Sequence, residues 1–459
     1  GRLSTKTLGG TLDATAYTYN VRSWLSGISG PRFTENLYYT TNPVSLPSFT
    51  ACYNGNISGM KWSIPSEALG YDRAYSFTYN ALNQMTSGNY CGKSGSSTYS
   101  GTTGKYDETV TYDKMGNIQT LTRLENGSGL NQLTYDYIGN QLLKVDNALS
   151  PVLPYGSEAF NDRAQVATEY LYNKNGNVIY DANGAISTIG YNLLNLPEVV
   201  QFSQGHQNRY SYSMSGKKLT VTSYTLNSAI VVPLGTINDP PSGSNFTKVT
   251  TDNIDNKIYQ NSSLKQIQTS EGYSQGGVYY YYLKDHLGNT RIIINSSGTI
   301  IEKSHYYPFG MRFYPESSSN SNAIAFRYNG KEYDSMNGLN HYDYGARFYD
   351  PALGRWHTPD PLAEKYFSLS PYCYAANNPI KFIDSDGKDI LIWYKNDNGQ
   401  MNSYRYTGGS ISHSNSYVNK VATAWNYNVS NGKDNGGGKP SYEAATNRNI
   451  TINVRETDG

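Results

Sequence analysis

Residues 342–387 read YDYGARFYDPALGRWHTPDPLAEKYFSLSPYCYAANNPIKFIDSDG. This block gathers aromatic residues, Asp-Pro steps, Arg and Gly, and the composition changes abruptly after Gly387. The sequence before the block is repetitive, and the sequence after it is not. We therefore interpret the block as a boundary between two parts of the chain.

One short phrase, Tyr-(Asn/Asp)-x-x-(Gly/Asn), recurs before the block. Its copies begin at Tyr79, Tyr112, Tyr135, Tyr172 and Tyr191, and a looser copy runs from Tyr282 through Gly288. Each copy predicts a β-hairpin in which Tyr ends a strand, the Asn or Asp side chain bonds to the backbone, and Gly or Asn adopts the positive φ that closes the turn. Because a lone hairpin cannot bury its face, the hairpins are expected to stack into one continuous sheet.

The composition agrees with a β-rich protein. The 459 residues include 45 Tyr, only 16% are charged and 37% are hydrophobic, which excludes a coiled coil. Tyr, Thr, Ser, Asn and Gly suit half-buried strands joined by tight turns. The net charge is +1 without a basic stripe, so the repeat region is not expected to bind nucleic acid. No run of about 18 apolar residues indicates a membrane span.

The repeat phrase and the boundary block resemble the bacterial Rhs/YD-repeat family and its repeat-associated core motif, over about residues 15–387. Five segments of the block match the core motif: Arg347–Pro351, Gly354–Trp356, Asp360–Leu362, Asn377–Pro379 and Asp384–Gly387. The resemblance implies an all-β fold: stacked YD-repeat hairpins that form a curved β-sheet shell segment, followed by a small α+β C-terminal piece. This chain would supply the last part of the shell wall.

The expected organisation has five parts. Residues 1–226 hold YD/Rhs repeats, 227–260 a loop or insertion, 261–341 further repeat strands, 342–387 the core motif, and 388–459 the N-terminal part of a variable effector domain. In the last part, Ile390–Tyr394 and Ser403–Tyr406 are predicted to form a hairpin, and 417–427 a helix.

The family resemblance also implies a site of self-cleavage, because the core of several family members cuts its own chain. The acid/base pair would be Asp360 and Asp384, which could share a proton, and cleavage would fall at Gly387 or Lys388. Arg347 or Arg355 would hold a carboxylate through a bidentate contact. Ala363 and Ser385 depart from the family pattern. The alternative is that these Asp and Arg residues cap turns and pair with each other to seal the end of the sheet.

Three functions follow as hypotheses. In the first, the chain is part of a secreted or cell-surface bacterial polymorphic toxin, whose shell encapsulates its own C-terminal effector and whose further partner is an immunity protein. The second is an extracellular adhesion protein that contacts a target-cell surface or carbohydrate through exposed Tyr and Asn. The third is an aspartyl autoprotease. The six histidines are scattered and show no metal-binding spacing, so neither a metal nor a cofactor is predicted.

Overall fold

The computed structural model describes residues 3–65, 71–94, 99, 104–149, 158–314, 317, 326–365, 369–388, 392–395 and 401–404. Within these residues nearly all of the regular secondary structure is β-strand, and the only helices are short 3-10 turns. The all-β prediction is therefore confirmed. The chain divides into two compact units: residues 1–128, 285–288 and 360 onward form the first, and residues 129–284 and 289–359 form the second. No helix in the described part is long and apolar enough to cross a membrane.

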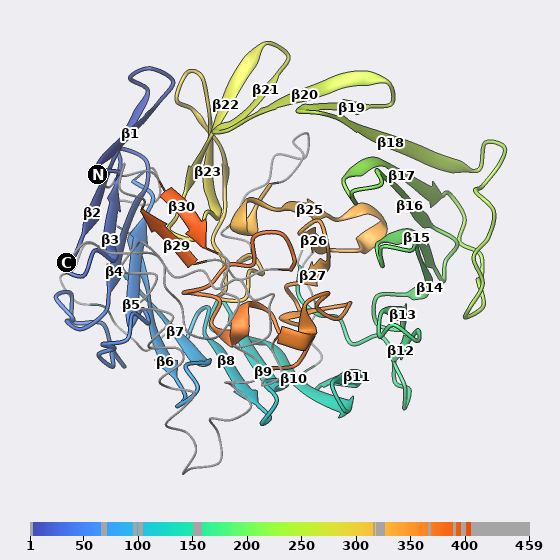
Figure 1. The fold of residues 1–459 in the computed structure, drawn as a ribbon, viewed down its shortest axis with the longest axis horizontal. Coiled ribbons are helices and arrows are strands. Elements are labelled where there is room, and N and C mark those ends of the chain that lie inside the picture. The colour runs from blue at the N-terminus through green and yellow to red at the C-terminus, as the bar shows by residue number, and fades with distance from the viewer. Residues whose placement is uncertain are drawn as a thin grey trace. The chain divides into compact units, whose positions relative to one another are not determined.

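The first unit is a ladder of antiparallel strands whose spatial order is their order in the sequence (Figure 1). Each strand bonds to the next along the chain, as expected for stacked hairpins. The strands are β1 (Thr5–Leu8), β2 (Asp13–Tyr19), β3 (Leu25–Ser29), β4 (Thr34–Tyr38), β5 (Gly59–Ser63), β6 (Tyr71–Tyr79), β7 (Met85–Ser94), β8 (Glu108–Tyr112) and β9 (Ile118–Glu125). The first unit also contains the 3-10 turns η3 (Ala363–Lys365) and η4 (Ala375–Asn377).

The second unit continues the same pattern. Strands β10 (Ser128–Ile138) and β11 (Gln141–Asn147) pair with each other, and a 13-stranded sheet follows in sequence order. Its strands are β12 (Tyr170–Tyr172), β13 (Val178–Asp181), β14 (Ile186–Tyr191), β15 (Pro197–Phe202), β16 (Gln207–Tyr212), β17 (Lys218–Leu226), β18 (Phe246–Ile254), β19 (Lys257–Gln260), β20 (Ser263–Thr269), β21 (Gly272–Gln275), β22 (Val278–Lys284), β23 (Thr290–Asn295) and β24 (Ile300–Lys303).

The start of the core block and the residues just before it form a small four-stranded sheet in the second unit. Its strands are β25 (Glu332–Asp334), β26 (His341–Asp343), β27 (Phe348–Asp350) and β28 (Arg355–Trp356), accompanied by the 3-10 turns η1 (Tyr328–Gly330) and η2 (Met336–Gly338). Phe348 packs in one apolar cluster with Ile186, Val200 and Tyr210 of the repeat strands. The core block is therefore built onto the repeat sheet of its own unit.

Ion pairs strengthen this attachment. The ammonium of Lys218, on β17, lies 2.6 Å from Asp343 and 2.9 Å from Glu332, both on strands of the small sheet. The hydroxyl of Tyr210 donates to the carboxylate of Asp334 at 2.8 Å. Buried charges are tolerated only when they are paired in this way.

The turns between repeat strands have one recurring geometry. The side-chain oxygen of Asp113 accepts hydrogen bonds from the backbone N–H groups of Met115 and Asn117, both at 2.8 Å. Gly116 between them has φ +79°, the left-handed region that glycine enters without steric cost. The same pair of bonds forms around Asn20, Asn80, Asn173, Asn192 and Asn295.

The tyrosine of the phrase binds back to the preceding repeat. The hydroxyl of Tyr79 donates to the carbonyl of Ile57 at 2.7 Å, and the hydroxyl of Tyr112 donates to the carbonyl of Met85 at 2.6 Å. The same kind of bond joins Tyr19 to Leu3, Tyr39 to Leu25, Tyr191 to Val178, Tyr212 to Pro197 and Tyr306 to Thr290. The repeated Tyr is thus a link between neighbouring repeats.

Two sequence-based expectations need correction. Asp136, in the copy that begins at Tyr135, does not cap a turn but pairs with Lys144 inside the sheet, because β10 runs on to Ile138 and turns at Gly139-Asn140. The loop expected at 227–260 is shorter, since residues 246–254 and 257–260 form β18 and β19. The β-prone run of Thr, Val and Ile in this stretch favours strands.

A hairpin follows the core block. Strands β29 (Ile392–Lys395) and β30 (Met401–Tyr404) pair antiparallel, with Ile392 opposite Tyr404. The hairpin predicted in this region is therefore present. The helix predicted at 417–427 lies outside the described residues.

Candidate functional site

The Asn-Asn-Pro segment of the core block lies against the repeat turns of the first unit. The amide of Asn377 donates to the carbonyl of Gly116 at 2.8 Å, and the amide of Asn378 donates to the carbonyl of Asn83 at 2.8 Å. The ammonium of Lys381 donates to the carbonyl of Asn54 at 3.1 Å. Both asparagines are buried. One short segment thus covers the turns that follow β6 and β8 and the loop that leads into β5.

The two predicted catalytic aspartates also lie in the first unit, and each caps a turn. The carboxylate of Asp384 is buried, and its Oδ1 accepts hydrogen bonds from the backbone N–H groups of Gly387 at 2.7 Å and Lys388 at 3.1 Å. Asp360 is half-buried, and its Oδ1 accepts from the N–H of Leu362 at 2.8 Å. Asp384 therefore directly contacts both residues of the predicted cleavage site.

The two predicted arginines lie in the second unit and stack on aromatic rings. The guanidinium carbon of Arg347 is 4.1 Å from the ring centroid of Trp356, and that of Arg355 is 5.2 Å from the centroid of Tyr137. Arg355 also donates to the carbonyl of Asn140 at 3.2 Å. Both side chains are buried. Arg347 thus packs within the core block, whereas Arg355 contacts β10 and the turn after it. Self-cleavage and the sealing alternative both stay predictions.

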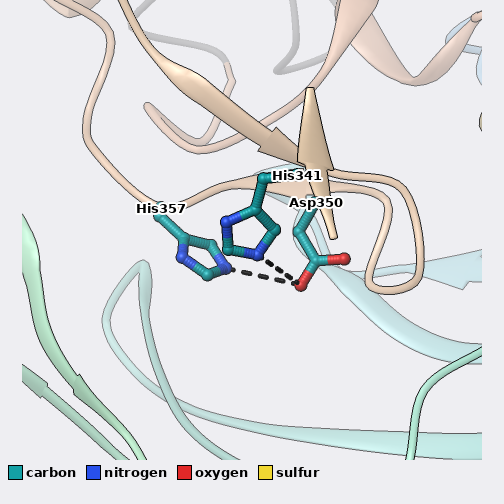
Figure 2. Close-up of side chains that lie close together, drawn as sticks. All are labelled: His341, Asp350 and His357. Carbon is teal, nitrogen blue, oxygen red and sulfur yellow. Dashed lines mark ion pairs between the residues drawn. The ribbon is translucent and has the colours of Figure 1, made fainter. Parts of the chain in front are cut away.

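The structure brings together a cluster that the sequence did not predict. His341 on β26, Asp350 on β27 and His357 just after β28 direct their polar atoms toward one another in the second unit (Figure 2). Oδ2 of Asp350 lies 3.6 Å from Nε2 of His341 and 3.4 Å from Nε2 of His357. The two imidazole rings meet nearly edge to face, with their centroids 4.3 Å apart. All three side chains are buried.

The electrostatics of the cluster favour an ionised carboxylate beside a neutral imidazole. Burial opposes ionisation of Asp350, but the two histidines outweigh it and hold its pKa well below the usual value. Burial and the neighbouring His341 ring lower the pKa of His357. A second carboxyl, Asp181 on β13, interacts with all three residues, and burial raises its pKa.

A cavity borders the cluster. Its wall contains His341 and His357. Most of the remaining wall is apolar, with Ile189, Val200 and Phe348 contributing. The cluster is therefore buried beside a small, mostly apolar cavity.

Strand register explains both why the cluster forms and why it escaped prediction. Tyr342 pairs with Tyr349 and Asp343 with Phe348, so the same register sets His341 opposite Asp350. His357 follows β28, whose Arg355 pairs with Asp350. The spacing His-x8-Asp-x6-His matches no standard metal motif. Only a correct hairpin register across the core block could have revealed it.

The first unit contains a second His-carboxylate group with different geometry. Nδ1 of His286 lies 3.0 Å from Glu35 Oε1, and Nε2 lies 3.0 Å from the carbonyl of Ile380. Burial lowers the pKa of His286, but Glu35 and Asp285 outweigh it, so the pKa is raised. Both ring nitrogens thus face hydrogen-bond acceptors, which suits a protonated imidazolium.

The ladder and its attached core block define the class of the protein: a β-repeat shell protein. In comparisons with known proteins, residues 273–398 match the family model "Teneurin YD-shell". The chain is similar to the toxin subunit YenC1 of Yersinia entomophaga, at 31% identity over 140 residues, covering 29% of this chain and 14% of YenC1. It is also similar to salivary gland surface protein 1 of Aedes aegypti, at 42% identity over 117 residues, covering 26% of this chain and 3% of that protein.

One solved structure supports the fold. The crystal structure of TcdB2-TccC3-Cdc42 matches with a TM-score of 0.58 at 17% identity, covering 82% of this chain and 18% of that chain. Together with the repeat geometry, these matches identify the chain as an Rhs/YD-repeat protein. The chain spans only a small part of the length of the curated relatives it matches.

Proposed function

We propose that this chain is the core-proximal wall and cap of an Rhs-type toxin, and that it keeps a C-terminal effector apart from its surroundings until delivery outside the producing cell. The observation that carries the proposal is the contact between the Asn-Asn-Pro segment and the repeat turns. Asn377 and Asn378 bind the carbonyls of Gly116 and Asn83, so the end of the core block is tied to the ladder immediately before the tail begins.

The comparisons support the toxin class. The YenC1 relative is a toxin subunit by name, and the solved structure with the same fold contains TccC3. An effector and an immunity protein remain the expected partners.

The repeat tyrosines argue against the adhesion alternative. A surface that stacks sugars needs exposed rings, whereas Tyr79, Tyr112 and Tyr191 are half-buried and use their hydroxyls to bond the preceding repeat. One relative is named as a surface protein of a mosquito, which is the observation that favours adhesion. If the chain is an adhesion protein, it should bind glycans. A glycan array on the purified chain distinguishes the two functions.

Limited proteolysis tests the cap. Trypsin should cut the chain after Lys388 more slowly in the wild type than in the double variant Asn377→Ala/Asn378→Ala, because the variant loses the bonds that tie the segment to the turns. Asn175→Ala is the matched control, since Asn175 is an exposed turn asparagine. Equal cutting rates in all three proteins would reject the cap.

Self-cleavage is a second candidate, favoured by one observation. The carboxylate of Asp384 accepts hydrogen bonds from the N–H groups of both Gly387 and Lys388, and this contact with the predicted scissile bond supports the candidate. Intact mass and N-terminal sequencing of the purified chain should reveal a new terminus at Lys388. Asp360→Asn should abolish the cut if Asp360 is the second acid, and a chain that stays whole under native conditions counts against cleavage.

A further inference from the structure

We propose that His341, Asp350 and His357 form a binding site for a divalent transition-metal ion, with Zn²⁺ as the best match, which fastens the strands of the core block together. The three residues offer two imidazole nitrogens and one carboxylate oxygen within 4.8 Å of one another. Imidazole and carboxylate ligands in this ratio are common at zinc and related metal sites.

The distances fit a shared metal ion better than direct hydrogen bonds. The carboxylate oxygen lies 3.4 and 3.6 Å from the two Nε2 atoms, which is longer than the 2.7–3.2 Å of an ordinary N–H···O bond. Two ligands at about 2.0–2.1 Å from a tetrahedral Zn²⁺ are about 3.3–3.4 Å apart. Nε2 of His357 is buried and lies farther from Asp350 than an ordinary hydrogen bond.

The second oxygen of Asp350 is already occupied. Its Oδ1 accepts from the N–H groups of Ala352 at 2.8 Å and Leu353 at 3.1 Å, and these bonds fix the orientation of the carboxylate. Oδ2 is thereby directed at the two histidines. Bonds that orient a ligand in this way are a regular feature of metal sites.

The cluster around His286 provides an internal comparison. It is also a His-carboxylate group, but its ring nitrogens lie 3.0 Å from Glu35 and from the carbonyl of Ile380. Those distances are normal hydrogen bonds, so that cluster is complete without an ion. The ring nitrogens of His286 lie 3.0 Å from their acceptor oxygens, whereas those of His341 and His357 lie 3.6 and 3.4 Å from Asp350. The longer distances favour the group around Asp350 as the metal site.

A second carboxyl, that of Asp181, lies beside the cluster. Asp350 and Asp181 are both buried, and Asp181 sits on β13, whose Val178 N–H donates to the carbonyl of His357 at 3.0 Å. Arg347 lines the same cavity, but its guanidinium stacks on Trp356.

The position of the site suggests its role. Strands β26, β27 and β28 are only two or three residues long, and so short a sheet gains little stability from its own hydrogen bonds. One ion bound to residues of all three segments would hold them in register, as structural metal ions do in small domains.

Metal analysis of the untagged 459-residue chain tests the proposal. After equilibration with Zn²⁺ and removal of excess, mass spectrometry of the metal content should find about one Zn²⁺ per chain. Asp350→Asn and His357→Ala should each retain less than about a tenth of it. His206→Gln is the control, because His206 lies outside the cluster and should keep the full content.

A spectroscopic measurement remains decisive if a variant folds poorly. Co²⁺ added to the metal-free wild type should give the visible absorption of a low-symmetry site with nitrogen ligands, and His357→Cys should bind Co²⁺ and add a thiolate charge-transfer band. Folded wild-type protein that binds no Zn²⁺ or Co²⁺ overturns the proposal. Full zinc retention in folded Asp350→Asn and His357→Ala overturns it as well.

Discussion

His286 shows how a single charged residue can control the stability of the first unit. Its ring is buried between Glu35 and the carbonyl of Ile380, and its own backbone N–H donates to Glu35 at 3.0 Å. Glu35 lies on β4, whereas Ile380 belongs to the core block. The imidazolium therefore joins a repeat strand to the core block, and Asp285 is the other acid that favours its charge.

The raised pKa of His286 predicts a pH dependence. The protonated ring stabilises the fold fully below its unfolded pKa of about 6.5, and this contribution is lost as the pH rises through the higher pKa of the folded state. The melting temperature of the wild type should therefore fall relative to that of His286→Gln as the pH rises from about 6 to 9. Parallel pH profiles of the two proteins would contradict this role.

Gly116 combines a turn conformation with a close contact. A Cβ there would lie 3.0 Å from the Asn377 amide and 3.1 Å from the Gln84 amide, on a backbone with φ +79°. Gly116→Ala should thus destabilise the chain by about 1–3 kcal/mol in urea unfolding. Gly139→Ala is the control, because Gly139 has φ +62° and no atom within 4 Å of the added carbon. If Gly116→Ala lowers the free energy of unfolding no more than Gly139→Ala does, the close contact with Asn377 does not contribute to stability.

At the scale of the element, the bond from each repeat Tyr to the preceding repeat should contribute to stability. Tyr112→Phe removes the hydroxyl that donates to the carbonyl of Met85 at 2.6 Å, and we expect a loss of about 1 kcal/mol. Tyr279→Phe is the comparison, since that side chain is 53% exposed and should change stability little. Equal effects in chemical denaturation would mean that the repeated Tyr acts through its ring alone.

Lys218 tests the attachment of the small sheet to the repeat strands. Lys218→Met leaves Asp343 and Glu332 without their buried partner, so the free energy of unfolding should fall by about 3–5 kcal/mol. Adding Asp343→Leu to Lys218→Met should recover part of the loss, because one unpaired charge is then removed. A double variant less stable than Lys218→Met alone would contradict this explanation.

How much could be predicted from the sequence differs between elements. The Tyr-Asn/Asp phrase predicted the turns at Asn80, Asp113, Asn173 and Asn192, because capping and positive φ are local properties of a few residues. It failed at Asp136, where an equally local turn at Gly139-Asn140 closes the hairpin.

The candidate site was harder to predict, because its residues are joined by pairing between strands. The core motif was recognised from its own residues, but His341, Asp350 and His357 meet only through the register of β26 to β28. The bonds of Asn377 and Asn378 to turns more than 250 residues earlier likewise depend on the fold of the whole first unit. The spacing of these residues along the chain does not reveal either set of contacts.

At the scale of the whole molecule, the proposed function requires that the core block closes the repeat ladder within each unit. In the first unit this closure is made by Asn377, Asn378 and Lys381 on the repeat turns. In the second unit it is made by the small sheet on β14 to β17. Containment of an effector requires both attachments to persist in solution.

Hydrogen–deuterium exchange of the 459-residue chain, read by mass spectrometry, tests this closure most directly. Residues 374–382 and the turns at 80–84 and 113–117 should exchange slowly in the wild type and lose protection together in Asn377→Ala/Asn378→Ala, because they form one bonded group. Exchange of 374–382 at the rate of an unstructured peptide in the wild type, while the repeat strands stay protected, would contradict the account.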